Sequence, residues 1–597
     1  MAEPVNLNQL FFGAMDRAAN RPVVMRRKQG ERWEDISGAE LLNRVNDLSL
    51  GLRELGVRVK DRVAILSENR PEWAIADYAC LALCAADVPI YPTLPAKQIE
   101  YILRDSGATV AFVSTPQQHA KIQEIRAQLP ALRHVVVFDE SVASGDVLTF
   151  TALCLRGRAA RAAVPNWRSE ALGAKSDDIA TIIYTSGTTG DPKGVMLTHG
   201  NITSNVVACV SLLDISGADE CLSFLPLSHI FERMVGHYTM LHRGVTISYA
   251  SSPETVAAEM AEIRPTIMAA VPRLYEKIYA RVLDAAVSGS PVKKRIFFWA
   301  KRNAETWVEY SLARRAIPGS LAFKKRMGDR LVFSKLRART GGRIRFFVSG
   351  GAPLNPEIAK FFHAAGLPIL EGYGLTETSP VIAVNTFKYL KLGTVGRPIP
   401  GVEVRIADDG EILTRGPHVM IGYYNKPEGT REAIDPDGWF HTGDIGVLDG
   451  DGFLRITDRK KDIIVTAGGK NIAPQPIENM VKTSKFVSNC VMLGDNRKFP
   501  VMVVVPNVDT LKAWASRHGF IAPDDRSLLA LPEVTAKMDR EVRKTLRDLA
   551  QFEVPKRLLL VASDFTVDSG ELTPTLKVKR RVVERNYARQ IEQLFHE

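Results

Sequence analysis

The alternation of short apolar runs with helix-like segments restricts the fold of this chain more than any other feature of its sequence. Residues 62–66 precede a helical pattern over 71–86, residues 109–113 precede another over 117–129, and the apolar run 134–138 follows. Strand, helix and strand in this order are typical of parallel sheets with crossover helices. The sequence therefore predicts an α/β fold.

The length of the chain, 597 residues, exceeds what one hydrophobic core usually supports. We expect a large N-terminal domain over residues 1–460, with parallel and mixed sheets, flanking helices and a small β unit. In that unit, the segments 403–406 and 411–414 have an alternating polar and apolar pattern and flank a turn at Asp409 and Gly410. Residues 461–597 are long enough for their own core, and we expect them to form a smaller α+β domain.

Several classes of protein are disfavoured by the sequence. The six cysteines are too few and too scattered for a disulfide framework or a structural zinc site. The chain does not open with a basic segment followed by an apolar stretch. No window approaches the roughly 18 uninterrupted apolar residues of a membrane-spanning helix. We expect a reduced, cytoplasmic protein.

The positive charge is concentrated in one segment, which we call the basic insert (about 281–345). This segment holds 17 Lys and Arg against four acids, so its net charge is +13 and the rest of the chain carries −2. Apolar and aromatic residues separate its basic clusters, and a helix with two such faces could lie on an anionic bilayer. Alternatively, the aromatics pack on the body and the cations are solvated. No nucleic-acid recognition module accompanies the charge, so we do not expect nucleic acid as a partner.

The segment 184–194, YTSGTTGDPKG, follows an apolar strand over 181–184. Open α/β sheets bind ligands at the carboxyl ends of their strands. Glycines let the backbone approach a ligand, hydroxyls and amides donate hydrogen bonds, and Lys193 adds a positive charge. The spacing differs from that of a Walker A loop. A Ser/Thr/Gly linker is the alternative, but the pattern favours a loop that binds the phosphates of a nucleotide.

This loop resembles the AMP-binding signature of the acyl-adenylate-forming superfamily. Segments 371–377, 438–444, 458–462 and 572–577 resemble the other motifs of that family, in the same order. The segment 271–277, VPRLYEK, with the 71 residues that follow it before Ser349, resembles the long-chain fatty acid:CoA ligases of this superfamily. The resemblance implies an AMP-forming acid–thiol ligase of fatty acid metabolism. Such an enzyme converts a long-chain fatty acid, ATP and CoA into acyl-CoA, AMP and pyrophosphate through an acyl-adenylate.

The resemblance also implies an ATP site. Adenine would lie against the backbone at Gly350, with Tyr373 on its other face, and Asp444 would accept hydrogen bonds from the ribose. Mg²⁺ would be held by Glu377 and Thr185. The expected ATP-binding residues are Thr185, Ser186, Gly187, Thr188, Thr189, Gly190, Lys193, Gly350, Gly351, Ala352, Gly372, Tyr373, Gly374, Thr376, Asp444, Arg459 and Lys577.

Lys577 is the expected catalytic group, together with Glu377 and Thr185. A positioned ammonium favours the transition state, in which negative charge builds on the phosphoryl oxygens and the leaving pyrophosphate. The family pattern has Gly before this lysine and Arg three positions after it. Here Leu576 replaces the Gly and Arg580 keeps the Arg. Lys579 is the competing assignment.

CoA and the acyl chain are expected to use other residues. The resemblance implies that the C-terminal domain is mobile and rotates about Lys461, withdrawing Lys577 after adenylation. Gly468, Gly469 and Lys470 would then approach a narrow pantetheine tunnel. His229 could gate the thiol or line the wall of the tunnel.

Two other functions compete with this one. A fatty acyl-AMP ligase would deliver its adenylate to a carrier protein, but residues 461–470 contain no insertion that would hinder rotation, which favours CoA. The second alternative is a non-catalytic lipid-binding membrane scaffold. Such a scaffold would not need Thr185, Glu377, Asp444 and Lys577, so the presence of all four residues argues against it. We expect a cytoplasmic enzyme, and for its basic insert both peripheral membrane contact and packing on the body stay open.

Overall fold

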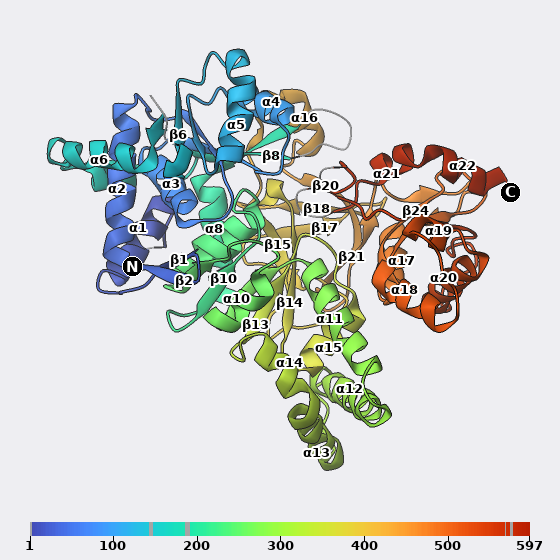
Figure 1. The fold of residues 1–597 in the computed structure, drawn as a ribbon. Helices are drawn as coiled ribbons and strands as arrows, with labels where there is room; N and C mark the ends of the chain where they lie inside the picture. The colour runs from blue at the N-terminus through green and yellow to red at the C-terminus, as the bar shows by residue number, and fades with distance from the viewer. Residues whose placement is uncertain (1–2, 143–146, 186–191, 567–568, 574–576, 597) are drawn as a thin grey trace.

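The computed structural model describes residues 3–142, 147–185, 192–566, 569–573 and 577–596, and confirms the predicted α/β class (Figure 1). An eight-stranded sheet forms the first part of the body, and five of its seven pairings are parallel. In sheet order its strands are β19 (Gly422–Tyr423), β9 (Lys193–Thr198), β8 (Ile179–Thr185), β4 (Ala86–Ile90), β3 (Arg62–Leu66), β5 (Val110–Val113), β6 (His134–Val137) and β7 (Leu148–Thr149).

A nine-stranded mixed sheet forms the second part of the body, and its strands β10 to β14 run parallel where they pair. In sheet order they are β16 (Arg397–Pro398), β15 (Val381–Val384), β14 (Ile369–Gly374), β13 (Phe346–Ser349), β12 (Ile267–Ala270), β10 (Glu220–Ser223), β11 (Thr246–Tyr249), β1 (Met25–Gln29) and β2 (Arg32–Ile36).

The predicted small β unit is present as a four-stranded antiparallel sheet of β17 (Glu403–Ile406), β18 (Glu411–Arg415), β20 (Phe440–Leu448) and β21 (Leu454–Arg459). The C-terminal residues add β22 (Ile464–Val465), β23 (Asn471–Ile472), β24 (Val487–Leu493), β25 (Val501–Pro506) and β26 (Leu558–Leu560). Two buried apolar clusters draw their members only from residues 464–595. This part therefore has cores of its own, as expected for an α+β block of this length.

Helices cover both large sheets, which buries their apolar strands. From residue 7 to residue 364 the helices of the chain are α1 (Leu7–Arg17), α2 (Gly38–Glu54), α3 (Pro71–Ala82), α4 (Ala96–Ser106), α5 (Pro116–Ile125), α6 (Phe150–Ala160), α7 (Trp167–Leu172), α8 (His199–Leu212), α9 (Thr239–His242), α10 (Val256–Ile263), α11 (Pro272–Val287), α12 (Pro291–Leu312), α13 (Gly319–Gly328), α14 (Ser334–Arg339) and α15 (Pro356–Ala364). Further on lie α16 (Pro427–Ala433), α17 (Pro474–Val481), α18 (Val508–Arg517), α19 (Asp525–Leu529), α20 (Pro532–Thr545), α21 (Arg580–Asn586) and α22 (Ala588–His596).

One boundary differs from the sequence prediction. The helical pattern was expected over 71–86, but α3 ends at Ala82 and β4 begins at Ala86. Cys84 lies between them with a φ of 53°, which turns the chain into the sheet. Both elements are fully buried, and a continuous apolar run does not distinguish a buried helix from a buried strand.

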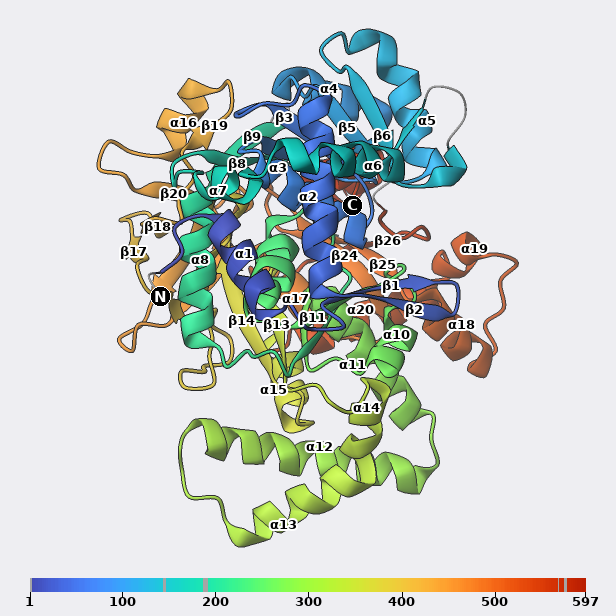
Figure 2. The same cartoon turned by 90° about the vertical axis from the view of Figure 1, so that its left-hand side faces the viewer.

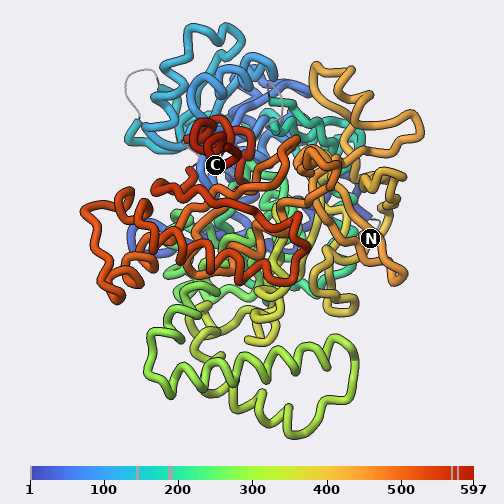
Figure 3. The backbone as a smooth tube through the Cα atoms, turned by 90° about the vertical axis from the view of Figure 1, so that its right-hand side faces the viewer, coloured from blue at the N-terminus to red at the C-terminus, as the bar shows by residue number. Residues whose placement is uncertain are grey.

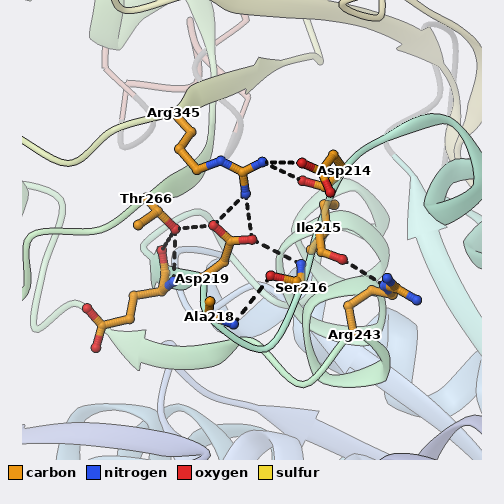
Figure 4. A network of polar contacts seen from close by, with 9 residues as sticks. Asp214, Ile215, Ser216, Ala218, Asp219, Arg243, Thr266 and Arg345 are labelled. Atoms are coloured by element: carbon orange, nitrogen blue, oxygen red, sulfur yellow. Dashed lines mark hydrogen bonds and ion pairs between the residues drawn. The ribbon is translucent and has the colours of Figure 1, made fainter.

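A polar network fixes the amino ends of three parallel strands (Figure 4). Arg345, just before β13, donates to both carboxylate oxygens of Asp219, just before β10, at 2.7 Å. Thr266, just before β12, donates to the same carboxylate at 2.7 Å. The network lies at the sheet edge opposite the strands' carboxyl ends, so it holds the scaffold together while leaving the other edge open to ligands.

The basic insert forms a helical projection built from α12 and α13 (Figures 1 and 2). Some of its cations are paired within the projection: Lys301 with Glu305 at 2.6 Å and Lys325 with Asp329 at 2.6 Å. Within the described residues, no helix is long and apolar enough to cross a bilayer.

Candidate active site

A cavity of about 1730 Å³ lies between the carboxyl edge of the nine-stranded sheet and the C-terminal residues. Figure 3 views the molecule from the side on which these C-terminal residues cover the body. The expected site residues that line the cavity are Thr185, His229, Gly350, Gly351, Ala352, Gly372, Tyr373, Gly374, Thr376, Glu377, Asp444, Arg459, Lys461 and Lys577. Residues far apart in the sequence thus meet around one space.

Five expected phosphate-loop residues lie outside the described part of the chain: Ser186, Gly187, Thr188, Thr189 and Gly190. The two ends of that loop are placed by β8 and β9, which pair Thr185 with Lys193. The hydroxyl of Thr185 donates to the carbonyl of Lys193 at 3.5 Å. The loop therefore begins at the carboxyl end of β8, as the sequence predicted.

Asp444 is held by two partners from different strands. The Tyr373 hydroxyl, from β14, donates to Oδ2 of Asp444 at 2.7 Å, and Arg459 Nε donates to Oδ1 at 3.0 Å. The Asp444 carboxylate is the main cause of the raised pKa of Arg459. A carboxylate has about four lone-pair sites, so Asp444 can still accept hydrogen bonds from a diol.

Glu377 has an unexpected partner in Tyr423. The hydroxyl of Tyr423, in β19, donates to Oε1 of Glu377 at 2.9 Å. Lys193 does not line the cavity; its Nζ lies 4.8 Å from the centroid of the Tyr423 ring. Tyr423 was missed because it is 46 residues away from Glu377 in sequence and belongs to no motif.

The donors around Glu377 fit Mg²⁺ bound together with a nucleotide. Mg²⁺ is usually held by one or two carboxylates plus substrate phosphates and waters. Glu377 supplies a carboxylate and Thr185 a hydroxyl, both on the cavity wall. The described residues contain no group of three or more His, Cys, Asp or Glu that could hold a metal by itself. Phosphate oxygens would therefore have to complete the coordination.

Lys577 reaches the cavity from a tight hairpin. The Lys577 N–H donates to Oγ1 of Thr573 at 3.0 Å, and its carbonyl accepts from the Thr573 N–H at 2.8 Å. The Lys577 side chain lines the cavity and is exposed to solvent there. Desolvation by the protein that surrounds the cavity lowers the pKa of Lys577 to about 8, and the Arg459 charge lowers it further, whereas Asp444 and Glu377 oppose the shift.

Lys579, the competing assignment, also lines the cavity. Its backbone N–H donates to the carbonyl of Glu571 at 2.7 Å, just before α21 begins. Arg580 forms an ion pair with Glu478 at 2.6 Å, which ties α21 to α17. The charges of Arg459, Asp444 and Glu377 act on the Lys577 ammonium, so Lys577 lies among these expected site residues.

His229 lies on the cavity wall in a neutral form. Burial lowers its pKa to about 3, and the nearby Lys577 ammonium lowers it further. Its Nδ1 accepts a hydrogen bond from the Phe231 N–H at 3.1 Å. The proton of the neutral ring therefore sits on Nε2, which makes His229 a hydrogen-bond donor there.

At two of the expected ATP-binding glycines, packing within the protein by itself disfavours a larger side chain. A Cβ at Gly374 would lie 1.6 Å from the carbonyl oxygen of Pro380, so this position must be glycine regardless of any ligand. A Cβ at Gly350 would lie 3.0 Å from Cε2 of Phe231. Both glycines line the cavity, yet the contact each avoids is with the protein itself.

Sequence reasoning missed an apolar part of the cavity lining, which we call the apolar arm. Its side chains come from α8, β15 and the π-helical segment η4 (Glu232–Tyr238), with short flanking stretches. No local pattern joins these segments, which the tertiary structure brings together. The residues of these segments that give the apolar lining are Cys209, Leu213, Ile215, Phe231, Val235, Met240, Val381 and Val384.

The expected CoA-binding residues lie elsewhere in this arrangement. Gly468, Gly469 and Lys470 are exposed and do not line the cavity, and Nζ of Lys470 lies 5.8 Å from the centroid of the Phe552 ring. Lys461 is exposed and borders the cavity. Lys577 and residues 468–470 therefore occupy different surroundings. That residues 468–470 take the place of Lys577 at the cavity during the reaction stays a prediction.

The chain is similar to known ligases along most of its length. It is 40% identical over 568 residues to the long-chain-fatty-acid–CoA ligase FadD15 of Mycobacterium tuberculosis, covering 94% of this chain and 93% of that protein. It is 36% identical to the peroxisomal long chain acyl-CoA synthetase 6 of Arabidopsis thaliana, covering 92% of this chain and 80% of that protein. It is 30% identical to human long-chain-fatty-acid–CoA ligase 6, covering 98% and 86%.

Solved structures share the fold. The adenylation domain of a carboxylate reductase from Mycobacterium chelonae has a TM-score of 0.76 at 22% identity and covers 99% of this chain and 91% of its own. The anthranilate CoA ligase AuaEII has a TM-score of 0.72 at 19% identity and covers 98% of both chains. Residues 11–424 match the family described as AMP-binding enzyme, and residues 461–597 match the AMP-binding enzyme C-terminal domain. The chain therefore belongs to the AMP-binding enzyme family.

Proposed function

We propose that this protein is a long-chain fatty acid:CoA ligase that works through an acyl-adenylate. One observation carries the proposal: a single cavity joins an apolar arm to Glu377, Asp444, Arg459 and Lys577. The apolar arm suits a fatty acyl chain, and the polar part suits ATP. The relatives named as long-chain ligases, at 30–40% identity, support the same substrate class.

In the proposed first half-reaction, the fatty carboxylate attacks the α-phosphorus of ATP and pyrophosphate leaves. Asp444, fixed by Tyr373 and Arg459, would accept hydrogen bonds from the ribose hydroxyls. Glu377 and Thr185 would hold Mg²⁺, which neutralises phosphate charge when bound. The Lys577 ammonium would stabilise the negative charge that develops on the phosphoryl oxygens.

In the proposed second half-reaction, the thiol of CoA attacks the acyl carbon of the adenylate, the acyl–oxygen bond breaks and AMP leaves. We propose that the C-terminal domain, 461–597, first rotates about Lys461. Rotation would withdraw Lys577 and bring Gly468, Gly469 and Lys470 to the thiol path. The neutral His229 would donate from Nε2 on the wall of that path.

A pyrophosphate-release panel across acyl chain lengths, with and without CoA, tests the proposal. We expect pyrophosphate release with long-chain acids and conversion to acyl-CoA when CoA is added. Acyl-AMP that accumulates and passes only to a carrier-protein phosphopantetheine would instead support the acyl-AMP ligase. If no acid supports pyrophosphate release, the result would instead support the non-catalytic lipid-binding scaffold.

The basic insert is the proposed contact with an anionic membrane. Its projection exposes large apolar side chains, among them Val292 at 67% and Phe323 at 66%. Lys293, Lys294 and Arg295 follow Val292 and are also exposed. Apolar side chains flanked by cations favour the interface of an anionic bilayer, where long-chain acids also partition.

Vesicle pelleting tests this contact. Replacing Val292, Trp299 and Phe323 with Ser should reduce pelleting on vesicles that contain phosphatidylserine and leave pelleting on neutral vesicles low. Ile521→Ser is the matched control, because Ile521 is 88% exposed but lies in the C-terminal part. If the triple variant and the control pellet equally, the projection does not contact the membrane, and its apolar residues serve only in packing.

A further inference from the structure

Lys577 sits in the cavity only because the C-terminal part is docked against the body. Among the described residues, three polar contacts between the two parts lie along α11 and the start of α15. There, Arg273 bonds to Ser488, Lys485 approaches Asp284 at 3.7 Å, and Asn355 donates to the carbonyl of Asn479 at 3.3 Å.

We propose that Arg273 is a positioning residue that holds Lys577 in its adenylation position through Ser488 and Asp564. The inference rests on the proposed function, because it assigns the contact to one of the two half-reactions. Arg273 lies in the first turn of α11, so its backbone is fixed to the body, whereas both partners belong to the C-terminal part.

The Arg273 contact is the best formed of the three. Nη1 of Arg273 donates to the carbonyl oxygen of Ser488 at 2.7 Å, and Nη2 donates to its hydroxyl oxygen at 3.4 Å. Glu276, one turn further along α11, lies 3.6 Å from the same guanidinium and favours its orientation. A planar guanidinium that engages two acceptors of one residue gives directional as well as electrostatic specificity.

From Ser488, hydrogen bonds continue toward the catalytic lysine. The Ser488 hydroxyl donates to Oδ2 of Asp564 at 2.9 Å. Two residues later, the carbonyl of Thr566 accepts from the Leu572 N–H at 2.9 Å. The adjacent Thr573 forms the hairpin with Lys577. The position of Arg273 is thereby transmitted to the Lys577 hairpin.

The two half-reactions should depend on this contact in opposite ways. Adenylation needs Lys577 in the cavity, so losing the contact should slow it. Rotation about Lys461 would require the Arg273 bonds to break, so losing them should not slow CoA attack. A residue that only supported the fold would affect both half-reactions alike.

The test separates the half-reactions in the full-length protein. Pyrophosphate release reports adenylation, and acyl-CoA formation from pre-formed acyl-AMP reports CoA attack. We expect Arg273→Ala to slow adenylation about tenfold, the ratio given by loss of one charge-assisted hydrogen bond. CoA attack should be unchanged or faster. Arg273→Lys, which keeps one charged donor, should recover part of the loss.

Two further variants keep the test decisive. Ser488→Ala removes the bond to Asp564 but keeps the backbone acceptor, so it should slow adenylation with CoA attack unaffected. Arg281→Ala is the matched control, because Arg281 is an exposed arginine on the same helix. Equal slowing of both half-reactions by Arg273→Ala, or no slowing of adenylation, would overturn the inference. Wild-type protein that releases no pyrophosphate with fatty acids would refute the proposed function instead.

Discussion

The low pKa of Lys577 predicts how adenylation depends on pH. The pKa of about 8 reflects desolvation by the protein around the cavity and the charge of Arg459. A group with that pKa is about 90% protonated at pH 7 and about 10% protonated at pH 9. An ordinary lysine, with a pKa near 10.4, would remain about 96% protonated at pH 9. In the proposed first half-reaction, the ammonium form is the one that stabilises the developing phosphoryl charge.

Raising the pH through 8 removes the positive charge of Lys577, so kcat/KM for ATP in pyrophosphate release should fall. Well above the pKa, the fall should approach tenfold per pH unit. Because kcat/KM reports the free enzyme, it samples the ionisation of the ligand-free site. The measurement is initial pyrophosphate release at subsaturating ATP, between pH 6 and 10.

Two variants test whether Lys577 is the group whose titration causes the fall. Lys577→Arg keeps a cation through pH 10, so the alkaline fall should disappear while the maximal rate is lower, because arginine does not reproduce the geometry of lysine. Lys579→Ala should leave the midpoint of the fall where it is in wild type. A wild-type kcat/KM that stays flat to pH 9.5, or a midpoint that moves in Lys579→Ala, would refute the assignment to Lys577.

Three further predictions concern other parts of the molecule. Lys461→Pro should reduce acyl-CoA formation more than pyrophosphate release, because proline fixes φ at the proposed pivot; equal losses would reject the proposed hinge. Arg345→Ala should lower the free energy of unfolding by about 1–3 kcal/mol in a denaturant titration, since the buried Asp219 carboxylate loses two hydrogen bonds; an unchanged midpoint with an unchanged slope would contradict this. Tyr423→Phe should shift the Mg²⁺ dependence of pyrophosphate release, because Glu377 loses its hydroxyl partner; an identical Mg²⁺ titration would exclude a role in orienting the carboxylate.

Local sequence was sufficient wherever one segment carries both its structure and its chemistry. The apolar run before the 184–194 loop predicted a strand, and β8 ends at Thr185. The turn at Asp409 and Gly410 predicted an antiparallel unit, and β17 pairs with β18 around it. Strand periodicity and turn residues act over a few positions, so these features can be recognised without knowing the rest of the fold.

Features that depend on distant segments became visible only in the folded chain. The end of α3 at Ala82 follows from how β4 enters the sheet, and an apolar run alone does not contain that information. The Tyr423 contact to Glu377 and the apolar arm are each formed by side chains from segments that no sequence motif connects. The pKa of Lys577 likewise depends on Arg459, 118 positions earlier in the sequence. Side-chain contacts and electrostatic fields act through space, so the motifs supplied the parts of this site and packing selected their partners.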